Sequence, residues 1–162
     1  MHTTNSRYQN YAGFSLIELL IVVAIIGIIA SIAIPNLLAS RRAANEGSAQ
    51  QSIRTISSCE TAYKFSYGNG SYADLPTLGA KVMTDSVLSS GTKSGYSFVA
   101  TPVSAPSDQF WAYAFPVTTT GIGSTGSRRF AVTEDGVLRG DTNLTGPPAS
   151  QVAAQAMPPM GN

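Results

Sequence analysis

The hydrophobic pattern divides the chain into four stretches of different character. Residues 1–13 are polar and lack apolar periodicity, whereas residues 14–34 form a nearly continuous apolar run. At about 1.5 Å of rise per helical residue, this run is long enough to cross a bilayer core of about 30 Å. Residues 35–67 read as an amphipathic helix, and glycine, serine, threonine, proline and aromatic residues dominate beyond them. The pattern predicts a membrane-length helix that continues into a one-sided helix and then into turns and strands.

The amphipathic stretch is predicted to bury one face against a core. Residues spaced by three and four share that face, and five of the six are apolar or aromatic: Ala49, Ile53, Ile56, Glu60, Tyr63 and Tyr67. Gly68-Asn69-Gly70 is a strong stop signal, because both residue types tolerate the left-handed conformation that ends helices. We therefore expect one long helix from near Phe14 to about Tyr67. Gly27 and Pro35 are expected to bend or locally melt it, since proline removes a backbone donor and clashes with the preceding turn.

Four short segments in the second half have the composition and alternation of strands. They cover residues 96–100, 110–115, 129–133 and 136–139, and Asp135-Gly136 is a hairpin signal between the last two. The predicted fold is α+β: the long N-terminal helix packs on a small antiparallel sheet of about four strands.

We expect residues 68–144 to form a loop plus that sheet. Residues 145–162 are rich in proline, alanine, glutamine and methionine without periodicity, and we expect them to form a flexible tail.

Charged residues are scarce, and their positions argue against nucleic-acid binding and against catalysis. Charged residues make up 12% of the chain, the net charge is +1, and Glu18 is the only charged residue between Phe14 and Ser40. The doublets Arg41-Arg42 and Arg128-Arg129 are too few for the basic footprint of a nucleic-acid-binding protein, so a nucleic-acid partner is not expected. The only histidine, His2, lies in the polar leader, so no catalytic constellation is predicted and no enzyme activity is expected.

Three interpretations compete for the apolar run. It could be a plain membrane anchor, or a secretory signal peptide with a small-residue cleavage site at Ala30-Ser31-Ile32-Ala33. A signal peptide normally has a shorter apolar stretch, a basic start and no acid, whereas here Glu18 lies inside the run. In the third interpretation, cleavage between Gly13 and Phe14 creates an ammonium one helical turn before Glu18. The pair could then fix the register between staggered copies of an otherwise featureless apolar helix.

The residues from Gly13 through Phe14-Ser15-Leu16-Ile17-Glu18 to Ala30, with Pro35-Asn36-Leu37-Leu38, resemble the processing and methylation motif of type IV pilins and related pseudopilins. The resemblance implies that residues 1–13 are a leader peptide, with Gly13 recognised by prepilin peptidase. It implies further that Phe14 becomes the N-methylated first residue and that Glu18 serves methylation and assembly. Gly27 and Pro35 fall where helices of this family kink or melt inside filaments. The leader departs from the family pattern, because it holds Arg7 and His2 in place of several basic residues.

On this resemblance, residues 14–40 are a transmembrane and polymerisation helix and residues 41–67 the amphipathic helix of a globular domain. The implied function is that of a structural subunit of a type IV pilus. The implied partners are further copies of the chain, prepilin peptidase, an inner-membrane assembly platform and the inner membrane before assembly. The precursor would lie in the inner membrane and the assembled filament in the periplasm or outside the cell. Two alternatives stay open: a pseudopilin of a type II secretion system, and an anchored binding module that never polymerises.

Other candidate sites carry a weaker signal. Glu134, Asp135 and Asp141, with Asp108, could supply oxygen ligands for calcium, although acids in hairpin turns are the more common reason for such residues. No other metal or cofactor is expected.

Single residue types add little. Cys59 has no disulfide partner in the chain and is expected to be a buried small hydrophobe. The aromatic run 110–115 is interpreted as sheet core and not as a stacking platform for a ligand. One or two of Tyr63, Phe65 and Tyr67 are expected to be exposed, because they point to different helix faces.

Overall fold

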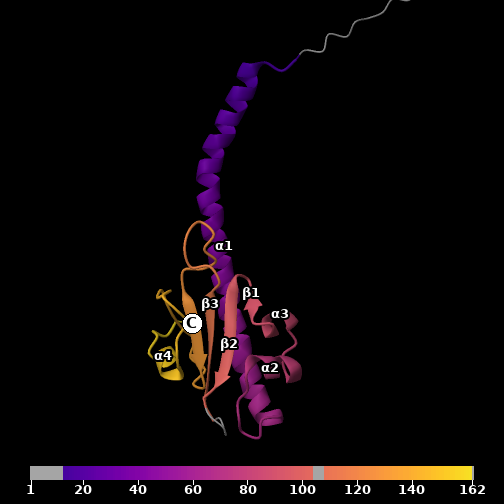
Figure 1. The fold of residues 1–162 in the computed structure, drawn as a ribbon, viewed down its shortest axis with the longest axis vertical. Helices are drawn as coiled ribbons and strands as arrows, with labels where there is room; N and C mark the ends of the chain where they lie inside the picture. Colours follow the sequence, from indigo (N-terminus) through magenta and orange to yellow (C-terminus); the bar gives the residue numbers. More distant parts are fainter. Residues whose placement is uncertain (1–12, 104–107, 162) are drawn as a thin grey trace, which may run out of the picture. The chain divides into compact units, whose positions relative to one another are not determined.

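The computed structural model describes residues 13–103 and 108–161. The chain forms two compact units, one ending at Leu37 and one beginning at Leu38, and each is described by itself. Helix α1 (Leu16–Ser66) contributes to both and is drawn as one ribbon in Figure 1. The helix is unbroken through Gly27 and Pro35, so the local melting expected at these residues is not seen here. A kink inside an assembled filament stays a prediction.

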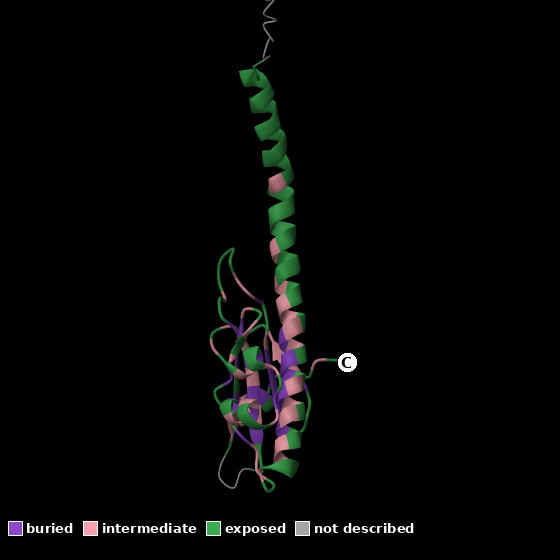
Figure 2. Cartoon of the chain, turned by 90° about the vertical axis from the view of Figure 1, so that its right-hand side faces the viewer, coloured by how far each residue is buried: buried purple, intermediate pink, exposed green. Residues whose placement is uncertain are grey.

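The second half of α1 is amphipathic, as its spacing predicts. Ala49, Ile53 and Ile56 are fully buried, and Figure 2 shows buried residues along one side of this part of the helix. The helix ends where the glycine and asparagine residues predict. The Gly68 N–H donates to the Tyr63 carbonyl at 2.8 Å, and Asn69 has a positive φ of 48°. Left-handed residues of this kind satisfy the last carbonyls of a helix.

The predicted α+β fold is confirmed, with five antiparallel strands where about four were expected. The strands follow each other in space in chain order: β1 (Thr92–Lys93), β2 (Tyr96–Pro102), β3 (Phe110–Pro116), β4 (Arg129–Thr133) and β5 (Arg139–Asp141). Strand β1 was not predicted, because two residues are too short a run for alternation to register.

The strand predicted over residues 136–139 is wrong except at its last residue, since β5 begins at Arg139. The Asp135 side chain accepts the Val137 N–H at 3.0 Å and the Thr133 hydroxyl at 2.9 Å. Gly136 has a φ of +71°, which suits a turn. The side chain of Asp135 thus stabilises a longer loop in place of a two-residue hairpin, and Leu138 at its end is buried in the core.

Each face of the sheet has its own cover. On one face, the buried residues of α1 form a single cluster with alternate residues of β2, β3 and β4: Phe98, Ala100, Phe110, Ala112, Ala114, Phe130 and Val132. The opposite face carries Trp111 and Tyr113, whose rings stack with centroids 5.4 Å apart. Helix α4 (Gln151–Gln155) lies over them, with Ala154 and Met157 buried against Ala131. Figure 1 shows α4 on the β4 side and the short helices on the β1 side.

Residues 145–161 therefore differ from the flexible tail that was expected over residues 145–162. Ser150 caps α4, and the Met160 N–H donates to the Leu138 carbonyl at 2.9 Å. The loop expected after residue 68 contains two further short helices, α2 (Leu75–Lys81) and α3 (Ser86–Ser89). Asp74 and Asp85 cap their N-termini, a signal that the sequence already holds.

Candidate assembly site

The N-terminal part of α1 exposes an apolar surface that nothing in its own unit covers. Its large side chains from Leu16 to Ile34 are between 47% and 82% exposed, and Figure 2 shows this part of the helix as almost entirely exposed. The helix is long and apolar enough to cross a membrane, and none of its most apolar 18-residue window is buried. Exposed apolar area of this extent requires lipid or protein around it.

Glu18 closes the first turn of α1. The helix begins at Leu16, so Ser15 is the N-cap residue and Glu18 the third residue of the helix. The Glu18 Oε2 accepts the Ser15 N–H at 2.9 Å, which is the carboxylate half of a capping box. The favourable interaction of an acid with the positive end of the helix dipole adds to this bond. Glu18 stands out in the apolar run, but the S-x-x-E spacing of Ser15-Leu16-Ile17-Glu18 already predicts this cap.

Gly13 and Phe14 are exposed and precede the first helical turn. Gly13 has no helical or strand structure, and a side chain at its position would meet no atom within 4 Å. Among the described residues, nothing therefore crowds this position. Residues 1–12 of the predicted leader lie outside the described residues.

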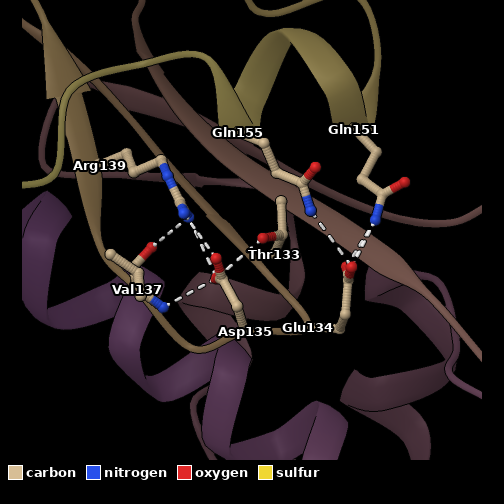
Figure 3. A network of polar contacts seen from close by, with 7 residues as sticks. All are labelled: Thr133, Glu134, Asp135, Val137, Arg139, Gln151 and Gln155. Atoms are coloured by element: carbon tan, nitrogen blue, oxygen red, sulfur yellow. Dashed lines mark hydrogen bonds and ion pairs between the residues drawn. The ribbon is translucent and has the colours of Figure 1, made fainter.

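The carboxylates proposed for calcium are each held by other groups. Asp141 forms a bidentate ion pair with Arg129, with the Nε–Oδ1 distance at 2.7 Å, and this pair lowers the pKa of Asp141. Asp135 binds the guanidinium of Arg139, which lowers its pKa to about 2. Figure 3 shows Asp135 facing Arg139, while Glu134 turns the other way.

Glu134 accepts from Gln151 Nε2 at 2.6 Å and from Gln155 Nε2 at 3.3 Å, so it ties α4 to the turn after β4 (Figure 3). Among the described residues there is no group of three acids, histidines or cysteines that could hold a metal ion, and Asp108 joins none. The structure thus gives these three carboxylates structural partners and does not gather them into one site.

The remaining candidates are explained by packing. Phe110 is buried, Trp111 and Tyr113 are partly buried under α4, and this supports the interpretation of the aromatic run as core. Cys59 is half-buried against the core, and burial together with the charge of Glu60 raises the pKa of its thiol.

Two further expectations concern exposed groups. Phe65 is 83% exposed and Tyr67 57% exposed, while Tyr63 packs against the core, so two of the three are exposed where one or two were expected. Tyr67 is exposed although its spacing placed it on the buried face. Arg129, one member of the second arginine doublet, forms an ion pair with Asp141. This pair leaves less free positive charge for binding a nucleic acid.

Glu60 is the residue whose environment the sequence analysis missed. It occupies a core position of α1 and is 0% exposed. Its Oε2 accepts the Ala73 N–H at 3.1 Å, and its Oε1 has no hydrogen-bond partner among the described residues. Burial raises the pKa of Glu60 to about 7, and the neighbouring charge of Asp74 adds to this effect, against the Ala73 bond. The signal was its place on the apolar face, where an acid breaks the pattern.

Comparison with known proteins identifies the N-terminal segment. The model of the prokaryotic N-terminal methylation motif matches residues 8–34. The type IV wide pilus major component PilA4 of Thermus thermophilus is 63% identical over 38 residues, which is 24% of this chain and 29% of that protein. The match thus spans less than a third of the curated relative. No solved structure matches the chain. Residues 8–34 therefore carry the motif of a family of structural subunits and not of enzymes, as the sequence predicts.

Proposed function

We propose that this chain, which carries the N-terminal methylation motif of type IV pilins and pilin-like proteins, is a structural subunit of a type IV pilus. The observation that carries the proposal is the combination of an uncovered apolar helix with a single acid in its first turn. A plain anchor needs the apolar length, but an uncharged glutamine would cap its first turn as well as Glu18 does, without the cost of a carboxylate in an apolar environment. The motif match supports an assembling subunit over an anchored binding module, and the similarity of the N-terminal residues to a wide-pilus component supports the pilus over a secretion pseudopilus.

Processing would begin at the exposed junction of Gly13 and Phe14. Cleavage there by prepilin peptidase turns the Phe14 nitrogen into a terminal amine, which is then methylated. This amine is the backbone nitrogen next to that of Ser15, and the Ser15 N–H lies 2.9 Å from the Glu18 carboxylate. The new positive charge thus arises within reach of Glu18 and offsets part of the cost of placing a carboxylate in an apolar environment.

Assembly would follow from the same pair of charges. The apolar faces of two copies of α1 pack without a preferred offset, because leucine, isoleucine and valine offer no directional bonds. A carboxylate in one copy and an amine in the next supply one directional contact, and this contact sets the register. The inner membrane holds the processed subunit until an assembly platform extracts it into the filament.

The test separates the charge of Glu18 from its capping role. Glu18→Gln keeps an oxygen that accepts the Ser15 N–H but removes the charge, whereas Glu18→Ala removes both. Surface filaments are counted by electron microscopy, and subunit in the membrane is measured by immunoblot. Both variants are expected to accumulate in the membrane without filaments.

The matched control is Glu46→Gln, which removes one negative charge from the same helix outside the apolar segment. It is expected to assemble like the parent. Normal filaments from the Glu18→Gln variant would show that the charge has no part in assembly.

A further inference from the structure

Two arginines without acidic partners follow the apolar run on α1. The run ends at Ile34, and Arg41 lies seven residues further along the unbroken helix, which is about 10 Å at the helical rise. Arg41 is exposed and Arg42 half-buried, and neither forms an ion pair within residues 13–103 and 108–161. The Arg42 Nε also lacks a hydrogen-bond partner there. These positive charges are therefore available to a group outside the chain.

An apolar loop tip lies beside the arginines. Ile122 lies between two glycines and is 78% exposed. It lines a cavity of about 100 Å³ with Leu38 and Arg41, so the tip and the helix share one surface. Residues 117–127 of the loop include no charged side chain. An isoleucine exposed to this extent gains free energy from any apolar surroundings that it enters.

Contacts with α1 hold this loop in place. The Asn45 Nδ2 donates to the Thr125 carbonyl at 2.9 Å. Glu46, the only acid in residues 37–50, accepts with its Oε1 the N–H and the hydroxyl of Ser127, each at 2.7 Å. These bonds direct the carboxylate to the loop. Because the loop is already held, little conformational entropy is lost when its tip meets a partner.

The distance of the arginines from the apolar run matches the headgroup region of a bilayer. Residues 14–34 are long enough to cover the hydrocarbon core, and the polar region extends about 5–8 Å beyond the core on each side. Helical side chains point back towards the N-terminus, so we expect both guanidinium groups to lie closer to the run than their Cα atoms do. Long arginine side chains at the end of a span reach the interface in this way. A guanidinium binds phosphate with two parallel hydrogen bonds, which suits it to a phospholipid headgroup.

We propose that Arg41, Arg42 and Ile122 form one docking surface for anionic phospholipids. The two guanidinium groups bind headgroup phosphates, and Ile122 enters the interface beside them. The surface holds the globular domain against the membrane while the apolar run is inserted. A nucleic acid offers phosphates as well, but it offers no apolar layer for Ile122 and no reason for the arginines to follow a membrane-length helix. The proposal rests on the proposed membrane insertion of the apolar run and not on filament assembly.

The test uses the full-length protein in lipid vesicles with a dye on the loop. Cys59→Ala removes the single thiol of the chain, and Thr120→Cys places the dye near the tip at an exposed position. Brominated lipid tails quench the dye when the loop lies at the membrane, and flotation separately measures insertion. Strong quenching is expected when a quarter of the phosphatidylcholine is replaced by phosphatidylglycerol, and weak quenching with phosphatidylcholine alone. The control dye, placed by Val152→Cys at a 73% exposed position on α4, is expected to stay unquenched in both.

Variants separate the two parts of the surface. Arg41→Gln is expected to lower the ratio of docked to undocked loop about fivefold on anionic vesicles, and the double variant with Arg42→Gln about 25-fold. Ile122→Asn is expected to lower this ratio about tenfold. Arg54→Gln is the matched control, because Arg54 is also exposed on α1 and forms no ion pair with any described residue. It should leave the ratio unchanged.

Equal quenching of the dye at position 120 in neutral and anionic vesicles would overturn the proposal, and so would equal quenching of the parent and the Arg41→Gln variant. The single variant gives this answer even if Arg42→Gln disturbs the fold. A protein that floats with the vesicles but keeps an unquenched dye contradicts this docking surface alone. A protein that does not float contradicts membrane insertion as well, and with it the proposed function.

Discussion

The burial of Glu60 predicts an unusual dependence of stability on pH. Burial raises the pKa of Glu60 from its ordinary value of 4.5 to about 7 in the folded protein. Between these values the folded protein binds more protons than the unfolded chain, so the free energy of unfolding falls as the pH rises. The stabilisation is fully present below about pH 4.5 and is lost as the pH rises through 7. At 1.36 kcal/mol for each pH unit, the loss over these 2.5 units is about 3 kcal/mol.

The decisive variant is Glu60→Gln, which has nearly the same shape and keeps an oxygen for the Ala73 N–H. It is expected to remove most of the slope between pH 4.5 and 7 and to be about 2 kcal/mol more stable than the parent at pH 8. The measurement is urea unfolding of the full-length protein in micelles at several pH values. The fluorescence of Trp111, the single tryptophan, reports on the sheet.

Glu46→Gln is the matched control, because it removes a carboxylate of the same helix that lies half-buried and binds Ser127. It should keep the slope of the parent. If Glu60→Gln shows the same slope as the parent, or is less stable at pH 8, then Glu60 is not the group that titrates in this range and the reasoning is wrong.

Three further predictions concern the globular part. Ile56→Ala should lower the free energy of unfolding by about 2–5 kcal/mol in urea titrations, because it leaves a cavity at a fully buried position; an unchanged midpoint would contradict the packing of α1 on the sheet. Asp135→Asn should flatten the loss of stability as the pH falls from about 4 through 2, because Arg139 lowers the pKa of Asp135; an identical acid transition would contradict that ion pair. Addition of calcium or of EDTA should leave the thermal midpoint unchanged, because the carboxylates of Asp135 and Asp141 are paired with arginines; a rise of several degrees with calcium would contradict this.

The parts of the fold that repeat a simple pattern could be predicted from the sequence. The long helix follows from an apolar run and a three–four spacing, and its end follows from Gly68-Asn69-Gly70. Strands β2, β3 and β4 follow from alternation within segments of five to seven residues. Each of these signals is local, so it can be read without knowledge of the tertiary contacts.

The remainder depends on contacts between distant residues. Whether Asp135 starts a hairpin or stabilises a longer loop is decided by Arg139 and Thr133, and two-residue turn statistics do not include them. The sequence 145–162 has no periodicity, yet it packs because Met157 finds the outer face of the sheet. The caps at Ser15 and Glu18 and at Asp74 were within reach of sequence reasoning.

The candidate assembly site and its surroundings likewise include residues that could be predicted from the sequence and others that could not. Gly13, Phe14 and Glu18 were predicted from a motif that needs no tertiary information, and they lie within residues 8–34, which the motif model matches. The buried environment of Glu60 arises only when the loop after α1 comes to lie against it. Glu60 interrupts the apolar face of the helix, but the spacing of the residues does not say what surrounds it.

We propose that the chain is processed between Gly13 and Phe14 and then polymerises. Mass spectrometry of the mature protein from the native host tests this proposal most directly. We predict a chain that begins at Phe14 and carries one added methyl group there, recovered from filaments sheared off the cell surface. A mature chain that begins at Met1, or at Ile34 after signal-peptide cleavage, would contradict it.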